Sequence, residues 1–179
     1  MNRFRSLSGV LNAGVNELVE VPGIGISSAI LLNMMPKLFG IYEADLRKEK
    51  GETFNREKIV NFLRTHYIGE TVEHSLLMLF DQNMRLIETV RFDKGTANHC
   101  TMDVSVIAEY VFTNHAAYFA VAHNHPNGSA KPSYEDISFT RFLNSVFDPL
   151  GKMLIDHYVV TMNEVRGIIL DRPTSKRKR

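Results

Sequence analysis

The sequence has little cysteine, no long apolar run and no recognisable leader. Its 179 residues contain a single cysteine, Cys100, which excludes an internal disulfide and any zinc site built mainly from thiolates. No stretch approaches the roughly 18–20 apolar residues that a membrane-spanning helix needs. Residues 1–14 lack a compact apolar segment followed by a cleavage site, so no signal peptide is expected. We therefore expect a cytoplasmic protein that makes no membrane contact.

What the composition does contain is ordinary for a folded protein. Apolar residues make up 44% of the chain and charged residues 23%. This balance is typical of a globular protein and rules out collagen-like, disordered and coiled-coil classes. The length fits one domain, or one domain with a small helical appendage.

The net charge of +1 hides an uneven distribution. Residues 172–179, RPTSKRKR, hold five of the 21 Lys and Arg and no acid, which leaves residues 1–171 with 16 basic against 20 acidic side chains, a net charge of −4. A body of that sign is not the basic surface of a nucleic-acid-binding protein. We expect residues 172–179 to be a disordered, solvated tail that is basic enough to contact phosphates.

Residues 1–40 have the pattern of a small helical module. Apolar residues recur at spacings of three and four over residues 11–19, and the segment VPGIG at 21–25 then interrupts the pattern. A second helix follows and is expected to end near Pro36. Residues 41–54 are rich in charge and are predicted to be a solvated linker.

Residues 55–171 alternate short apolar runs with helical patterns, which predicts one α/β (α+β) domain around a mixed sheet. Asn55 can cap the first helix of this domain. The expected strands are 75–80 and 86–92, which form a hairpin, then 118–122, 153–161 and 165–170, and the expected helices are 102–113 and 133–147.

The strongest chemical signal lies where the strand at 118–122 runs into a loop. His123 and His125 leave the same face of that strand, and Asp136 follows on the first turn of the next helix. Two imidazoles and one carboxylate leave a fourth tetrahedral position for water, which is typical of a catalytic zinc site rather than a closed structural one. Two alternatives stay open at this point: a chance spacing of core histidines, and a simple helix N-cap formed by Ser133 with Asp136 near the positive helix end.

The spacing His-x-His, seven residues, Ser, two residues, Asp is the JAMM motif of MPN/JAB-domain metallopeptidases. It occurs here as His123, His125, Ser133 and Asp136. The run AHNHPNGSAKPSYEDISFTRFL resembles the signature of the bacterial RadC-like proteins, and residues 72–81 and 154–160 resemble further parts of that branch. The resemblance extends over roughly residues 17–170 and is strongest from 117 to 160.

The resemblance implies a cytidine-deaminase-like fold and one Zn²⁺ per chain held by His123, His125 and Asp136. It also implies a general base, which alignment of the segment before the first strand identifies as Glu73, and a role for Ser133 in stabilising an oxyanion. The implied function is a zinc-dependent hydrolase that cleaves a peptide or isopeptide bond with a zinc-activated water, acting on an unidentified peptide or protein. An ordinary exposed glutamate at a strand entry is the alternative interpretation of Glu73.

Asp156 stands beside His157 and is a further candidate for orienting a zinc-bound imidazole. A strand pair that is fixed by local hydrogen bonds is the alternative. A zinc deaminase on the same fold is excluded because such enzymes need His-x-Glu and Pro-Cys-x-x-Cys.

Residues 18–29 resemble a helix-hairpin-helix, a motif whose hairpin amides hold a DNA phosphate. Ser27 and Ser28 follow the hairpin where Lys or Arg would strengthen DNA binding. Two interpretations stay open: weak DNA binding through the hairpin around Gly23 and Gly25 or through the basic tail, and a module that packs or docks a partner. The alternative function of the chain is accordingly a DNA-associated, DNA-repair-type binding protein with a structural or residual metal site. The sequence leaves the oligomeric state open.

Overall fold

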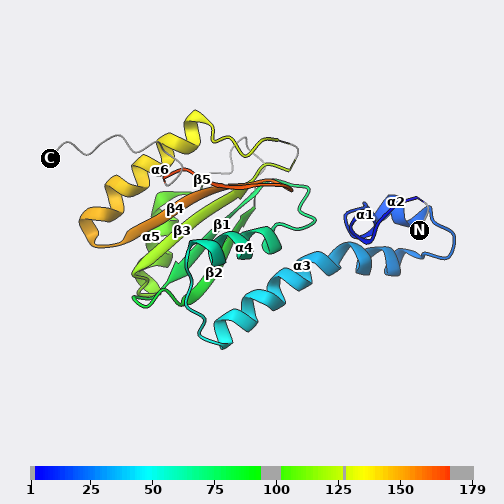
Figure 1. Ribbon diagram of the computed structural model, residues 1–179, viewed down its shortest axis with the longest axis horizontal. Coiled ribbons are helices and arrows are strands. Elements are labelled where there is room, and N and C mark those ends of the chain that lie inside the picture. Colours follow the sequence, from blue (N-terminus) through cyan, green and yellow to red (C-terminus); the bar gives the residue numbers. More distant parts are fainter. Residues whose placement is uncertain (1–2, 94–101, 127, 170–179) are drawn as a thin grey trace.

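The computed structural model describes residues 3–93, 102–126 and 128–169, so Cys100 and the basic tail at 172–179 lie outside the described residues (Figure 1). The described chain contains six α-helices, five strands and one 3₁₀ turn. They are α1 (Leu7–Leu11), α2 (Val15–Val19), α3 (Ile26–Glu49), α4 (Arg56–His66), β1 (His74–Phe80), β2 (Leu86–Asp93), α5 (Val104–Thr113), β3 (Tyr118–Asn124), α6 (Tyr134–Phe147), the 3₁₀ turn Asp148–Leu150, β4 (Met153–Val160) and β5 (Val165–Gly167). None of the described helices is both long and apolar enough to cross a membrane.

The strands form one mixed sheet in the order β2-β1-β3-β4-β5. β1 is antiparallel to both β2 and β3, and β4 is antiparallel to β5. β3 and β4 are parallel, and α6 makes the crossover between them. The predicted α/β class with a mixed sheet is therefore confirmed.

Two apolar layers cover the two faces of the sheet, because successive residues of a buried strand point to opposite sides. Leu76, Met78 and Phe80 of β1 pack with Phe62 of α4 in one cluster. The intervening Leu77 and Leu79 pack in the other cluster with α5 and α6, through side chains that include Ile107 and Phe147. Each fully buried side chain of this size stabilises the fold by about 1.5–3 kcal/mol. The fully buried β1 thus joins both layers.

Capping residues fix where the helices begin. The side chain of Asn55 accepts a hydrogen bond from the Lys58 amide at 2.9 Å, as the sequence pattern predicts for the start of α4. Ser133 caps α6 in the same way. These caps place the first turn of α6 directly after the loop that leaves β3.

The helix after the hairpin is longer than predicted. α3 does not end at Pro36 but runs on to Glu49, so the first part of the predicted linker 41–54 is helical. The Pro36 ring is buried beside Gly69, and this packing offsets the backbone hydrogen bond that a proline removes. Beyond Pro36 the sequence EADLRKE favours helix, and an ion pair of 3.6 Å joins Glu43 to Arg47 one turn later.

The short helices α1 and α2 pack against the amino-terminal part of α3, at the far end of that helix from the sheet (Figure 1). Ala13, Leu18 and Ala29 form the buried centre of this module. The turn between α2 and α3 needs a glycine, because Gly23 has a φ of +92°. Gly25 then stands at the N-cap of α3.

Candidate metal centre

A cavity of about 420 Å³ lies where β3 ends and α6 begins. Every residue that the sequence assigned to catalysis or metal binding lines it, namely Glu73, His123, His125, Ser133 and Asp136, and so do Ser75, Met102, Glu135, Phe139 and His157. The structure therefore brings together side chains from before β1, from β3, from the start of α6 and from β4.

Strand register explains why these side chains share one face. Ser75 pairs with His123 across the antiparallel β1–β3 ladder, and Glu73 precedes Ser75 by two residues. In the parallel β3–β4 ladder Val121 pairs with His157. Since side chains two residues apart in a strand leave the same face, all of these polar groups point toward α5 and α6. They replace the apolar side chains that fill the other end of that layer.

Three ligand-type atoms lie close together in the cavity. The Nε2 atoms of His123 and His125 are 3.1 Å apart, and Oδ1 of Asp136 lies 3.4 Å from His123 Nε2. His123 is buried, whereas His125 is half-buried at the mouth of the loop. The predicted presentation of both imidazoles on one face of the strand is thus what the structure has.

The hydrogen bond behind His125 fixes its tautomer. His125 Nδ1 lies 2.8 Å from the Ser129 carbonyl oxygen. A carbonyl oxygen only accepts, so Nδ1 carries the proton and donates it. The Nε2 atom that faces His123 therefore keeps its lone pair, as a metal ligand must.

A buried chain of hydrogen bonds fixes the tautomer of His123. The Thr140 hydroxyl donates its single proton to the Asp136 carbonyl at 2.6 Å, so it accepts from His157 Nδ1 at 2.8 Å. His157 Nε2 then accepts from His123 Nδ1 at 2.9 Å, which leaves the lone pair of His123 on Nε2. Burial lowers the pKa of His157 to about 3, which keeps its ring neutral in this chain.

The sequence pattern missed His157 as a member of the site. One atom each of His123, Asp136 and His157 lie within 4.8 Å of one another, an arrangement that can hold a metal ion. The only sequence signal was the polar pair Asp156 and His157 within an otherwise apolar strand.

Asp136 is fixed by the first turn of α6. Its Oδ2 accepts from the Ser133 amide at 2.7 Å, and its own amide donates to Ser133 Oγ at 3.0 Å. The N-cap alternative for these two residues is therefore correct as local structure, and it leaves Oδ1 directed at His123. Burial acts to raise the pKa of Asp136, but the polar contacts of its carboxylate outweigh burial and hold the pKa well below its usual range.

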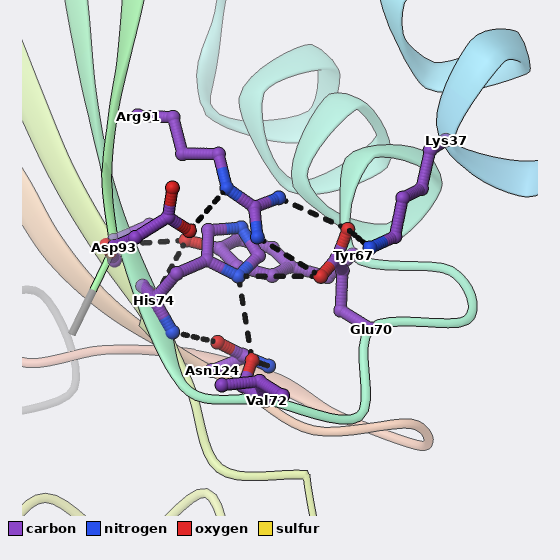
Figure 2. A network of polar contacts seen from close by, with 9 residues as sticks. Lys37, Tyr67, Glu70, Val72, His74, Arg91, Asp93 and Asn124 are labelled. Carbon is purple, nitrogen blue, oxygen red and sulfur yellow. Dashed lines mark hydrogen bonds and ion pairs between the residues drawn. The ribbon is translucent and has the colours of Figure 1, made fainter. Parts of the chain in front are cut away.

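The position of Glu73 depends on Asn124, the residue between the two histidines, whose side chain points to the opposite face of β3. Its carboxamide accepts from the His74 amide at 2.8 Å and donates to the Val72 carbonyl at 3.1 Å (Figure 2). The backbone on both sides of Glu73 is thereby bound to the strand that carries His123 and His125. Sequence patterns give no indication of this contact, because it joins residues some fifty positions apart.

An ionic network around the buried side chains of Glu70 and His74 supports the same stretch of backbone. Arg91 donates two hydrogen bonds to the Glu70 carboxylate, at 3.0 and 3.2 Å, and Glu70 also lies 3.6 Å from the fully buried His74 (Figure 2). Burial and the charge of Arg91 lower the pKa of His74. Burial favours a higher pKa for Glu70, but Arg91 outweighs it, and the pKa is lowered. Glu70 is therefore held as an anion at the entry to β1.

Asp156 does not take the role of orienting a zinc-bound imidazole, for which the sequence made it a candidate. Its Oδ1 accepts from the backbone amides of His157 and Ile169, both at 2.8 Å, while the His157 ring is bound by Thr140 and His123. A Cβ on Gly167 would come within 2.2 Å of Asp156 Oδ2, so this strand pair requires a glycine. Asp156 thus fixes the backbone of β4, as the alternative interpretation predicts.

Comparison with known proteins places the chain in a family. A family model described as the RadC-like JAB domain matches residues 53–169. The chain belongs to this family. A UPF0758 protein of Neisseria meningitidis is 30% identical over 167 residues, which is 93% of this chain and 74% of the relative. A UPF0758 protein of Acinetobacter baumannii is 28% identical over 162 residues, 90% of this chain and 69% of the relative. The resemblance to RadC-like proteins is therefore confirmed.

Proposed function

We propose that this member of the RadC-like JAB family is a zinc-dependent hydrolase that cleaves a peptide or isopeptide bond. One observation carries the proposal: two imidazole Nε2 atoms with free lone pairs and one ionised carboxylate oxygen converge in a cavity whose wall includes a further carboxylate, Glu73. A closed structural site would leave no position for water, and three protein ligands leave one.

The donor set fits zinc. Histidine nitrogens and a carboxylate oxygen are ligands that zinc prefers, and each has a hydrogen-bonded partner that fixes its orientation. We assign His123, His125 and Asp136 as the ligands. His157 is assigned to the position behind His123, because its Nε2 already accepts the proton of His123 Nδ1. When bound, zinc supplies a Lewis acid that lowers the pKa of a water molecule and polarises a carbonyl.

The remaining residues supply proton transfer and charge stabilisation. Glu73 accepts a proton from the attacking water and later returns it to the leaving amine. The hydrogen bonds of the Asn124 side chain to Val72 and His74 hold the backbone on both sides of Glu73. Ser133 lines the cavity at the start of α6, and we assign its hydroxyl to donate to the oxyanion of the carbonyl under attack. His125 and Glu135 lie on the open side of the cavity, where a substrate chain enters.

Metal analysis tests the ligand assignment. Wild-type chain dialysed against zinc should retain one zinc per chain, and His125→Ala should retain none. His157→Gln should bind zinc more weakly by roughly 10–100-fold, the usual effect of removing a group that orients a ligand. If His125→Ala kept stoichiometric zinc and His157→Gln lost it, the ligand set would be His123, Asp136 and His157 instead.

A cleavage screen tests the activity. Zinc-loaded chain is incubated with peptide and isopeptide libraries in ¹⁸O-labelled water, and the products are read by mass spectrometry. Hydrolysis should place one ¹⁸O in each new carboxylate and should stop when a chelator removes the zinc. A chain that holds one zinc yet cleaves no library would contradict the proposed hydrolase.

DNA binding stays a prediction for the hairpin around Gly23 and Gly25 and for the basic tail. A salt titration of duplex binding, with and without residues 176–179, tests it, since phosphate contacts weaken steeply as salt rises.

A further inference from the structure

The long helix α3 has its large and small apolar residues on unexpected sides. The face that packs on the rest of the protein is made of small or compact residues, with Ala29, Pro36 and Gly40 buried. The opposite face, here called the outer face of α3, carries large apolar side chains that are each 44–59% exposed. They are Ile30, Leu31, Met34, Met35, Leu38, Ile41 and Tyr42, and the exposed Ile26 and Phe39 lie at the two edges of this face.

The inner face has a packing explanation. α3 approaches α4 so closely that a Cβ on Gly40 would lie 3.6 Å from the Cα of His66. Only small residues permit that approach. The outer face has no such explanation, because an ordinary surface helix places its large apolar side chains toward the core and its polar ones toward water. An apolar patch of this extent is typical of a surface that binds another protein.

The spacing of the outer face is that of a helix that pairs with another helix. Leu31, Met34, Leu38 and Ile41 follow one another at intervals of three, four and three residues, the pattern of the core positions of a coiled coil. From Ile26 to Tyr42 the only charged residue is Lys37, and its ammonium group is turned toward Glu70 at 3.7 Å (Figure 2). The outer face is therefore apolar and free of charge over this length.

We propose that the outer face of α3 binds the same face of a second copy of this chain, with the two helices antiparallel. A face without charge or directional groups is complementary to itself, which is what a two-fold interface requires. Seven half-exposed large side chains, each contributing on the order of 100 Å², approach the roughly 800 Å² per partner of a standard interface.

The antiparallel direction follows from the charges that end the apolar stretch. Asp45 continues the Leu31 and Leu38 series at an interval of seven residues and is exposed. In a parallel pair Asp45 would face its own copy, and like charges in that position are destabilising. An antiparallel pair centred on Met34 and Met35 covers the apolar stretch of each helix with that of its partner and leaves residues 43–50 outside the contact.

Oligomeric state tests the proposal independently of any metal or activity. The full chain has a mass of 20.4 kDa, and light scattering coupled to gel filtration should report twice that mass. The double variant Met34→Glu/Met35→Glu should run as a monomer with an unchanged far-ultraviolet spectrum, since both side chains are half exposed. The matched control Leu150→Glu, at a residue 54% exposed elsewhere, should remain a dimer.

Crosslinking tests the direction. In a Cys100→Ser background, Met35→Cys should be linked to its own copy by a short bismaleimide, because this position lies at the two-fold axis. Asp45→Cys should not be linked, since the rise of a helix places its copy about 30 Å away. Efficient linkage at both positions would overturn the antiparallel arrangement. A wild-type chain that stays monomeric up to ~100 μM would overturn the proposal altogether.

Discussion

The metal cavity and the outer face of α3 depart from ordinary burial in opposite directions. The cavity withdraws imidazoles and a carboxylate from water, whereas α3 leaves large apolar side chains in it. Both departures lower the stability of an isolated chain, since buried polar groups require partners and exposed apolar groups forgo burial. The difference lies in where the compensation comes from.

In the cavity the compensation comes from within the chain. His123, His125, His157 and Asp136 each have a hydrogen-bond partner among the described residues. On the outer face of α3 the exposed side chains gain burial only if a second surface covers them. Buried polar groups therefore point to chemistry, and exposed large apolar groups point to association with another surface.

Removal of a cavity histidine should have the largest effect. His123→Ala should abolish stoichiometric zinc while most of the fold remains, because the lost ring contributes a ligand rather than apolar packing. Elemental analysis of the purified variant checks this. The exposed His115, which has a φ of 52°, provides a control as His115→Asn, since asparagine tolerates that backbone conformation. One zinc per chain in His123→Ala would refute the assignment.

Substitution of Glu73 should have the next largest effect, because we assign Glu73 to the attacking water and not to the metal. Glu73→Gln retains size and hydrogen bonding but cannot accept the proton. Zinc content should be unchanged, and hydrolysis should fall by roughly 10²–10⁴. Glu135→Gln changes another carboxylate of the same cavity and should lose far less. Equal rates for Glu73→Gln and the wild type would remove Glu73 from the mechanism.

A half-buried histidine outside the cavity, His66, predicts how stability depends on pH. Burial, together with the charge of His74, lowers the pKa of His66 from 6.5 to about 4. In the unfolded chain His66 therefore takes up a proton as the pH falls below 6.5, whereas in the folded chain it takes up that proton only near pH 4. The stability that neutral His66 provides is complete above pH 6.5 and is lost as the pH falls toward 4, at most about 3 kcal/mol.

Urea unfolding of metal-free protein at pH 7.5 and pH 5 measures this loss. His66→Gln should lose less stability between the two pH values than the wild type, whatever its baseline. His115→Asn, which removes an exposed histidine, should keep the wild-type difference. An unchanged difference in His66→Gln would show that other groups cause the acid sensitivity.

Asn124 gives the smallest of the expected effects. Asn124→Ala leaves the buried His74 amide without its partner, which costs about 1–3 kcal/mol. Zinc content should not change, because the ligands leave the other face of β3. Urea unfolding with parallel zinc analysis checks both. Asn114→Ala, which loses one hydrogen bond at the half-buried end of α5, should cost less. Wild-type stability in Asn124→Ala would show that the hydrogen bonds of Asn124 to the backbone around Glu73 contribute nothing to the free energy of unfolding.

The sequence predicted those parts of the molecule that depend on local patterns. The hairpin of β1 and β2, the cap at Ser133 and the shared face of His123 and His125 all follow from spacing over a few residues. The assignment of Glu73 came from resemblance to a family and not from spacing, and the structure places Glu73 in the cavity.

What the sequence did not predict depends on contacts between distant segments. The hydrogen bonds of His157 to His123 and Thr140 span 34 and 17 residues. The helix continues through Pro36 because the proline ring packs beside Gly69, and no local signal indicates that packing. Local propensity is overridden by tertiary contacts in both places.

Anomalous scattering at the zinc edge, measured on crystals of the zinc-loaded chain, decides which residues hold the metal. We predict one peak per chain, about 2.0–2.2 Å from Nε2 of His123, Nε2 of His125 and an Asp136 carboxylate oxygen. His157 should remain hydrogen-bonded to His123 and outside bonding distance of the ion. A peak bonded to His157, or no peak in this cavity, would contradict it.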